Sequence, residues 1–197
     1  MKSEELRLNP ILENLKRGGP AVILPKDFGQ IVAYTGIGKE SICIEAGTGS
    51  AFLTVSLANI CKKVYTYEKE KRFFDFAKEN IKRSFLDNIE IEHRDIIEKG
   101  FGDIFEKNKV DLIILDLPFA EKAVKYSRNV LKKGRFLVGY LTNIEQVKDF
   151  VKECENERFQ DIFTIEVIER EYLVKEKGTR PVHNGLLHTA YLVFAKK

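Results

Sequence analysis

The feature that most constrains this chain is a regular alternation of short apolar runs with segments whose apolar residues have helical spacing. Such alternation predicts βαβ units, in which helices join parallel strands and cover the sheet. The run Val110–Leu117 is the most continuous, as expected of a central parallel strand buried on both faces. The five expected strands are Ser41–Ala46, Lys63–Glu68, Ile89–Arg94, Val110–Leu117 and Gly134–Leu141.

The end of the chain departs from this alternation. Two further expected strands, Ile162–Glu171 and Ala190–Ala195, are separated only by a polar loop. Strands joined without a helix form a hairpin, so the last strand should run antiparallel at or near an edge of the sheet. We therefore expect an α/β fold with a doubly wound, Rossmann-like sheet that is mostly parallel and has a C-terminal antiparallel strand.

Length and composition narrow the class of protein. A chain of 197 residues fits one domain, with an N-terminal helical segment at 1–38 and the Rossmann-like core at 39–197. No apolar run approaches the roughly twenty residues of a membrane span, and the charged N-terminus lacks a signal peptide. The net charge of +3 is far from that of a dedicated nucleic-acid binder. We expect a cytoplasmic protein without membrane association.

The three cysteines, Cys43, Cys61 and Cys154, have no CxxC spacing. Their odd number and spacing indicate neither a disulfide framework nor a zinc site. We expect them to be small buried residues.

The strongest local signal lies where the first expected strand meets the first core helix, in Glu45-Ala46-Gly47-Thr48-Gly49-Ser50. In open α/β sheets this turn borders the ligand crevice. Glycine lets a ligand approach the backbone, and the helix that follows offers free N–H groups. A binding turn is favoured here over a purely structural one.

The residues around this turn narrow the class of ligand. A dinucleotide fingerprint requires a small residue at position 52, which is Phe52, and no Gly-Lys-Ser/Thr of a P-loop follows. Glu45 would repel a pyrophosphate but could pair with an ammonium group. A nicotinamide or flavin dinucleotide is therefore disfavoured.

Two carboxylates at the ends of the next strands complete a nucleoside site. Glu68 stands where a carboxylate accepts both hydroxyl groups of a ribose, the alternative being an exposed residue of a charged run. Asp95 could accept the adenine amino group, although a helix N-cap before Ile96 is nearly as good an interpretation. Ribose, adenine and an ammonium-bearing tail together describe S-adenosylmethionine.

The fourth expected strand ends in Leu115-Asp116-Leu117-Pro118. A carboxylate after five apolar residues is costly unless it is paired or used, and the carboxyl end of the strand faces the crevice. We favour Asp116 as a general base or a substrate-orienting group over a cap of the loop.

The polar loop between the last two strands carries Arg180, His183 and His188. Two histidines without a nearby cysteine or carboxylate ligand do not predict a metal site. Contact of Arg180 with substrate or phosphate, and a hairpin-stabilising hydrogen bond from a histidine, remain equal alternatives. Arg180 and His183 are the candidate substrate-binding residues.

With these motifs the sequence resembles the class I, Rossmann-like S-adenosylmethionine-dependent methyltransferases, and more narrowly the catalytic domain of the tRNA adenine-N1 methyltransferases. The EAGTGS turn alone is typical of many methyltransferases, whereas its combination with LDLP and HTAYLV is far more specific. The matching segments are Leu24-Pro25-Lys26-Asp27, Glu45–Ser50, Leu115–Pro118, Phe136–Leu141 with Gln146-Val147, Arg180-Pro181 and His188–Val193.

The resemblance implies a role for each candidate residue. Glu45 and the turn Gly47–Ser50 would contact the methionine moiety, Glu68 the ribose, and Asp95 the adenine of the cofactor. Asp116 would lie between the methyl group and the target base. In the family mechanism adenine N1 attacks the methyl group in line, while the matching carboxylate orients the exocyclic amine, so that catalysis is mostly positioning and electrostatics.

The sequence departs from the family pattern at several points. About twenty residues precede the match, where family members usually carry an N-terminal β-domain that helps engage tRNA. Leu24 replaces a common aromatic residue, Ala51 a glycine, and Phe119-Ala120-Glu121 the usual tryptophan-containing segment.

We expect an enzyme that methylates adenine N1 in tRNA. The alternatives are methylation of a small molecule or another RNA base, or a cofactor-binding subunit. A second copy of the chain or an RNA-binding subunit is a candidate partner.

Overall fold

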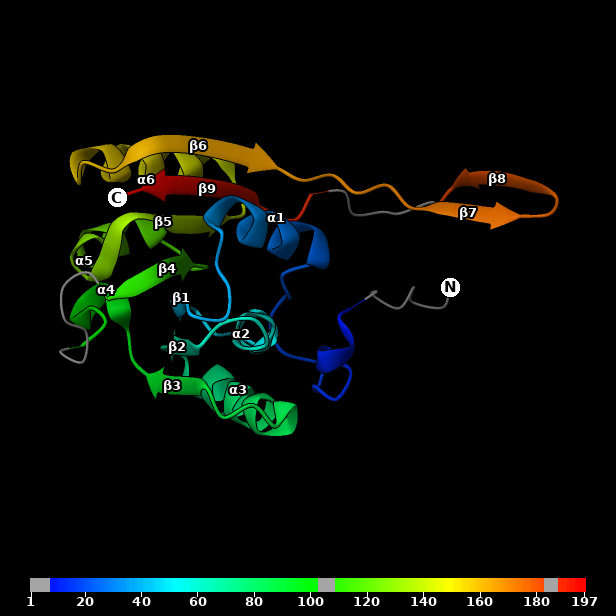
Figure 1. The fold of residues 1–197 in the computed structure, drawn as a ribbon, viewed down its shortest axis with the longest axis horizontal. Helices are drawn as coiled ribbons and strands as arrows, with labels where there is room; N and C mark the ends of the chain where they lie inside the picture. The colour runs from blue at the N-terminus through cyan, green and yellow to red at the C-terminus, as the bar shows by residue number, and fades with distance from the viewer. Residues whose placement is uncertain (1–7, 103–108, 183–187) are drawn as a thin grey trace.

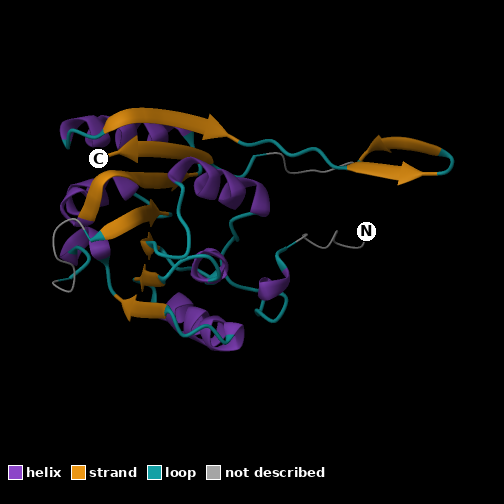
Figure 2. Cartoon of the chain, viewed as in Figure 1, coloured by secondary structure: helices purple, strands orange, loops and turns teal. Residues whose placement is uncertain are grey.

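The computed structural model describes residues 8–102, 109–182 and 188–197. In these ranges a seven-stranded sheet has the order β3-β2-β1-β4-β5-β9-β6, and helices cover both of its faces (Figures 1 and 2). Its strands are β1 (Ile42–Ala46), β2 (Lys63–Glu68), β3 (Ile89–His93), β4 (Val110–Leu115), β5 (Leu131–Leu141), β6 (Gln160–Glu166) and β9 (Tyr191–Lys196). The helical elements are η1 (Pro10–Leu12), α1 (Pro25–Thr35), α2 (Phe52–Ala58), α3 (Lys71–Ser84), α4 (Ile96–Lys99), η2 (Ala120–Ala123), α5 (Val124–Val130) and α6 (Ile144–Asn156).

The pairing of the strands confirms the expected fold class. β1 to β5 pair in parallel, while β9 is antiparallel to both β5 and β6. β9 therefore lies one strand from the edge, as expected of the last strand. All six residues of β4 are buried, which agrees with its continuous apolar run and its place in the middle of the sheet.

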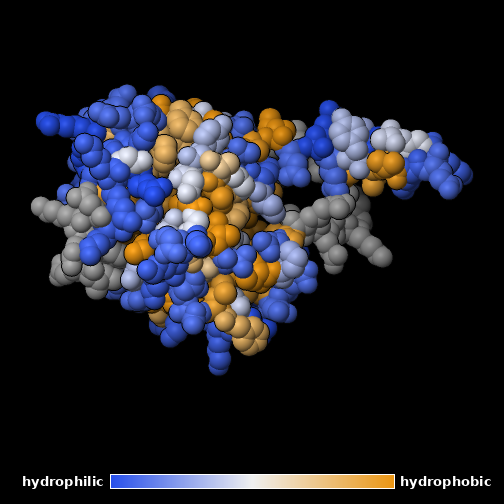
Figure 3. Space-filling view, viewed as in Figure 1, coloured by the Kyte–Doolittle hydropathy of each residue, from blue (hydrophilic) through white to orange (hydrophobic). Residues whose placement is uncertain are grey.

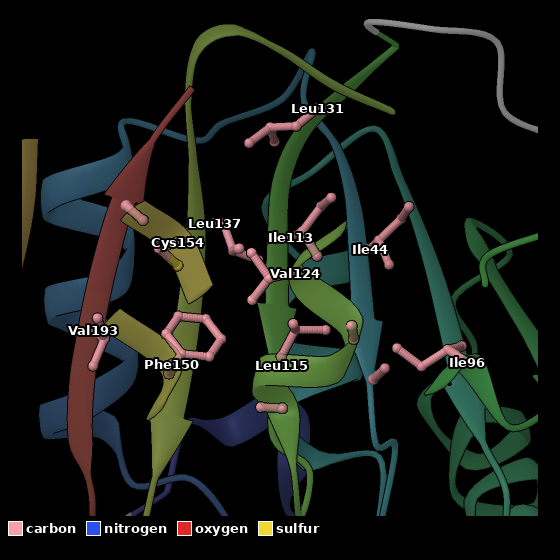
Figure 4. Close-up of a cluster of buried hydrophobic side chains, with 14 of the residues drawn as sticks. Ile44, Ile96, Ile113, Leu115, Val124, Leu131, Leu137, Phe150, Cys154 and Val193 are labelled. Carbon is pink, nitrogen blue, oxygen red and sulfur yellow. The ribbon is translucent and has the colours of Figure 1, made fainter. Parts of the chain in front are cut away.

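Alternate residues of the central strands pack into different layers of the core. Ile44, Ile113 and Leu137 point toward the layer that contains α5 and α6, where Figure 4 shows them with Phe150 and Val124. Neighbouring residues of the same strands point the other way, where α1 and α2 cover them with buried aliphatic side chains. Cys43, Leu112, Ile114, Ile31 and Leu57 belong to this second layer. The alternation follows from the two-residue repeat of a β-strand.

Some boundaries differ from those expected. The expected strand Ile162–Glu171 ends as β6 at Glu166, and the chain then leaves the sheet. The segment 120–131 begins as the 3-10 turn η2 before α5, and β5 starts at Leu131. Of the expected helical segment at the N-terminus, the described residues hold η1 and, further along, α1.

The chain forms a separate hairpin between β6 and β9. β7 (Tyr172–Lys175) and β8 (Gly178–Pro181) pair with each other and project from the body of the molecule (Figure 1). Because β6 runs in the same direction as the parallel strands, this arm leaves from the edge at which their carboxyl ends lie.

All three cysteines are buried and unbridged, which confirms the expectation for them, and the sulfur atoms of Cys43 and Cys61 lie 3.4 Å apart. None of the helices in the described ranges is long and apolar enough to cross a membrane.

Candidate active site

A cavity of about 860 Å³ opens at the carboxyl ends of β1, β2 and β4. This is the edge at which open α/β sheets bind their ligands. Its wall combines the turn after β1 with the segment 20–24, which precedes α1, and with the residues that lead into β9. Segments that are far apart in the sequence therefore enclose one site.

Glu45, in β1, lies at the bottom of this cavity and is 1% exposed. The hydroxyl groups of Thr54 and Thr66 both donate hydrogen bonds to its Oε2 atom. Burial raises the pKa of Glu45 to about 8. The hydrogen bonds from Thr54 and Thr66 lower this pKa, and the nearby charges of Asp116 and Glu68 raise it further. A cationic ligand in the cavity would stabilise the ionised form of Glu45, which burial disfavours in its absence.

Glu68, the last residue of β2, is buried, which excludes the alternative of an exposed glutamate. Its Oε2 atom accepts the backbone N–H of Gly49 at 2.9 Å, and its Oε1 atom accepts the N–H of Glu70 at 2.9 Å. The carboxylate thus fixes the glycine turn relative to β2. Gly49 has φ +55°, a backbone conformation that glycine adopts without steric cost. Thr48 adds a second link between turn and strand through the Thr66 hydroxyl, at 2.7 Å.

Asp116 directly follows β4 and faces the same cavity. Its backbone N–H donates to the Ala46 carbonyl at 2.6 Å, and its own carbonyl accepts from Gly47 at 3.3 Å. A Cβ atom on Gly47 would lie only 3.2 Å from that carbonyl oxygen, so glycine allows this close approach without a shift of the backbone. Burial raises the pKa of the Asp116 carboxyl group to about 7, with a further contribution from the charge of Glu68.

The ionisable groups that line the cavity are mostly acidic. Glu45, Glu68, Glu70 and Asp116 stand against one lysine, Lys69. Such a cavity favours a cationic ligand and disfavours a pyrophosphate. Its size and its largely apolar remaining wall suit a nucleoside, so the residues present fit S-adenosylmethionine.

Comparison with known proteins agrees with this site. Residues 19–179 match the family described as the tRNA methyltransferase complex GCD14 subunit. The chain belongs to this family. It is 39% identical to the tRNA (adenine(57)-N(1)/adenine(58)-N(1))-methyltransferase TrmI of Methanocaldococcus jannaschii, over 94% of the chain and 74% of that protein.

Other relatives of the GCD14-family chain differ in coverage. The catalytic subunit TRM61 of the tRNA (adenine(58)-N(1))-methyltransferase of Candida albicans is 31% identical over 84% of the chain, which spans 51% of that subunit. In structure, TrmI from Aquifex aeolicus superposes with a TM-score of 0.83 at 26% identity, covering 94% of the chain and 73% of that protein. The fold of the present chain is thus a Rossmann-like methyltransferase fold.

Asp95 has a structural role in this chain. It is the N-cap of α4, and its carboxyl group accepts the backbone N–H of Ile97 at 2.9 Å. This is the alternative that the sequence left open. Asp95 lines a small pocket beside the main cavity, and the two share Leu117 and Pro118. A contact with the adenine of the cofactor stays a prediction.

The two candidate substrate-binding residues are not brought to the cavity. Arg180 lies in β8, is exposed, and donates to the backbone carbonyl of Pro181 at 3.3 Å. His183 lies outside the described residues. Substrate contact by either residue stays a prediction.

Two polar networks that sequence reasoning did not assign to the site include residues of the cavity wall. In the first, which reaches the wall at Tyr140 and Thr189, the buried ammonium group of Lys26 donates to Asp27 at 2.8 Å, to the Val167 carbonyl at 2.7 Å and to the Thr189 hydroxyl at 2.6 Å. Thr189 and Tyr140 in turn donate to Asp27. The network ties the start of α1 to the sheet beside the cavity.

The second network centres on His188, which lines the cavity. Its Nδ1 atom lies 2.6 Å from Glu166 Oε1, and its Nε2 atom lies 3.0 Å from the Thr142 carbonyl oxygen. The carboxylate, and then the carbonyl, raise the pKa of the imidazole. This is the histidine hydrogen bond that the sequence offered as an alternative, and it joins β6 to the end of β5. In the sequence, the signal for these networks is that several of their residues lie in two of the family-like segments, Leu24-Pro25-Lys26-Asp27 and His188–Val193.

Proposed function

We propose that this chain is an S-adenosylmethionine-dependent methyltransferase that methylates N1 of adenine in tRNA. The observation that carries the proposal is the convergence of three carboxyl groups, Glu45, Glu68 and Asp116, around one cavity at the glycine turn. Family membership supports the reaction, because the related TrmI proteins are named for it. A cytoplasmic location follows from a tRNA substrate.

The cofactor, when bound, supplies an electrophilic methyl group on a positively charged sulfur. Glu45 and the turn Gly47–Ser50 would hold its methionine moiety, because the Glu45 carboxylate suits an ammonium group and the turn borders the cavity. Glu68, which already fixes the turn through Gly49, would accept the ribose hydroxyl groups. Asp95 would lie near the adenine.

Asp116 would act on the methyl acceptor. Its backbone is held by Ala46 and Gly47, so its carboxyl group keeps a fixed place at the mouth of β4. Accepting a hydrogen bond from the exocyclic amine of adenine would orient the base and increase the nucleophilicity of the ring nitrogen. A fixed carboxylate in a water-poor cavity stabilises developing positive charge on the base without reorganisation.

The decisive experiment incubates unmodified tRNA with the protein and S-adenosylmethionine, followed by mass spectrometry of the nucleosides. We expect N1-methyladenosine, and its absence alongside another methylated product would reject the substrate assignment. Calorimetry tests the cofactor separately. S-adenosylmethionine should bind, and NAD should not, because the acidic turn repels its pyrophosphate.

A partner is proposed on a different observation. The arm around β7 and β8 exposes three apolar side chains, Ile168, Tyr172 and Val174, and grouped exposed apolar side chains are typical of an interaction surface. Figure 3 shows apolar surface on this otherwise hydrophilic projection. A second copy of the chain would cover these residues and give a homo-oligomer; an RNA-binding subunit is the alternative occupant.

A further inference from the structure

One exposed aromatic residue next to the cavity-lining Pro118 has no role in the proposed cofactor site. Phe119 is 61% exposed, and its backbone has φ +61°, in the left-handed region. An aromatic residue rarely adopts this conformation, which glycine would adopt at no steric cost. The exposed ring gains little from burial, so the fold itself gives no reason for phenylalanine here.

The position of Phe119 relates it to the reaction. It lies three residues after Asp116 and directly follows Pro118, which lines the cavity. The backbone on its other side is anchored, because η2 begins at Ala120 with a buried side chain and the Lys122 N–H donates to the Phe119 carbonyl at 3.1 Å. The backbone of Phe119 is therefore anchored three residues from Asp116, the residue of the candidate methyl-transfer site.

The charge around Phe119 differs from that inside the cavity. The ammonium group of Lys122 lies 4.5 Å from the centre of the ring. Arg94 lines the small pocket next to Pro118, together with Asp95 and with Lys69, which this pocket shares with the main cavity. The cavity interior is acidic and repels phosphate, whereas this rim combines an aromatic face with cations. Aromatic rings next to basic side chains are the usual means of holding unpaired nucleotides, because every base can stack on a ring.

We propose that Phe119 stacks on an unpaired base that flanks the target adenine in the RNA substrate. The inference rests on the proposed function, since it names a contact with that substrate. Stacking next to Asp116 would hold the target base at the cavity while the phosphates stay outside its acidic interior. Phe119 would then contribute to the affinity for RNA and not to the affinity for S-adenosylmethionine.

A matched control is available in Phe85. It is 88% exposed, also has a left-handed backbone (φ +57°), and caps the carboxyl end of α3. Lys69 and Glu70, just before α3, line the cavity, so the length of α3, about 21 Å for 14 residues, separates Phe85 from it. Glycine relieves the same backbone strain at both positions.

The experiment measures binding of fluorescent tRNA by anisotropy, and KM and kcat of methylation, for the parent, Phe119→Gly, Phe119→Tyr and Phe85→Gly. We expect Phe119→Gly to weaken tRNA binding and raise KM roughly tenfold, the scale of one stacked base. Phe119→Tyr should stay within about twofold, Phe85→Gly should bind like the parent, and neither glycine variant should lower the melting temperature.

The possible outcomes separate the inference from the proposed function. Parent-like tRNA binding and KM in Phe119→Gly, with a parent that methylates tRNA, overturn the stacking role alone. Equal losses in Phe119→Gly and Phe85→Gly, or a loss of S-adenosylmethionine affinity in Phe119→Gly, also overturn it, because they indicate a structural effect. A parent that neither binds nor methylates tRNA overturns both proposals.

Discussion

Glu45 and Asp116 line the same cavity, but the protein holds them in different ways. The carboxyl group of Glu45 is fixed by two threonine hydroxyl groups, Thr54 and Thr66. Asp116 is fixed through its backbone, and its carboxyl group has no hydrogen-bond partner among the described residues. A fixed carboxyl group suits the proposed role of Glu45 in holding the cofactor, and a carboxyl group without a partner suits the proposed role of Asp116 in binding the substrate. It also leads to different predictions for the two side chains.

Glu45→Gln should make the cofactor-free protein more stable at pH 8 than the parent. The folded protein holds the pKa of Glu45 at about 8, above its ordinary value near 4.5. Its contribution to stability is therefore complete below pH 4.5 and is lost as the pH rises through about 8. Glutamine resembles the protonated acid and avoids this loss. Thermal unfolding at pH 5 and pH 8 should show a difference between variant and parent at pH 8 only.

The same variant should bind S-adenosylmethionine more weakly, because the carboxylate for the ammonium group is gone. A gain in stability combined with a loss of affinity would identify Glu45 as a residue kept for function. A variant that is less stable at both pH values, with its cofactor affinity unchanged, would instead assign Glu45 to the fold.

Asp116→Asn should lower methyl transfer by about a hundredfold or more, the typical effect of a positioned acid–base group. Burial raises the pKa of Asp116 to about 7, so kcat/KM of the parent should rise as the pH passes through this value and the carboxylate forms. The variant should lack this limb of the profile. The cofactor affinity should stay nearly unchanged and the melting temperature should not fall, because asparagine keeps the shape of the side chain and carries no charge that burial disfavours. A clear loss of stability with normal turnover would assign Asp116 to the loop before Pro118.

The candidate site residues differ in how far the sequence could predict them. Glu45, Glu68 and Asp116 each lie within one residue of the carboxyl end of an expected strand. The carboxyl ends of parallel strands meet at one edge, so local patterns place the three residues together. Lys26 could not be found in this way. Its contact with Thr189 spans 163 positions of the chain, and such a contact has no local signal.

At the scale of elements, α1 shows how a buried ion pair positions a helix at the site. Lys26 and Asp27 stand in its first turn, with side chains that are 8% and 0% exposed. Their partners come from the ends of β5 and β6 and from the start of the β9 segment. Leu24, which precedes α1, lines the cavity, so the network also fixes part of the cavity wall.

Asp27→Ala should lower the free energy of unfolding by about 3 kcal/mol, because it leaves the ammonium group of Lys26 buried without its counter-ion. Denaturant unfolding of the parent and the variant measures this loss. The control is Asp75→Ala, which removes the exposed i,i+4 partner of Lys71 and should leave stability almost unchanged. Equal effects of the two substitutions would show that the Lys26–Asp27 pair is not a buried anchor.

The elements also differ in how far they could be predicted. β1 and β4 were evident because a strand covered on both faces is a nearly continuous apolar run. The sequence does not predict the hairpin β7–β8, whose residues lie in the polar loop expected between the last two strands. All but one residue of β7 is exposed, so it lacks the apolar alternation that marks a half-buried strand. The local sign in the sequence is Gly178, which begins β8 directly after the turn and has φ +139°.

At the scale of the whole molecule, this hairpin is the part least explained by a single copy of the chain. A two-stranded hairpin is marginally stable in water by itself, because it buries little apolar surface. Here it forms its own sheet apart from the seven-stranded one and carries exposed Tyr172 and Val174. Packing against the same surface of a second copy would bury these side chains, since a two-fold axis places identical patches against each other.

The double variant Tyr172→Ser/Val174→Ser should therefore form a smaller species than the parent in size-exclusion chromatography with light scattering. Its melting temperature measured at low protein concentration, and its affinity for S-adenosylmethionine, should match those of the parent, because neither residue lines the cavity. Ile144→Ser is the control, since Ile144 is also exposed, at 47%, but lies on the body at the start of α6. A monomeric parent would contradict the homo-oligomer and leave the RNA-binding subunit as the occupant of the arm.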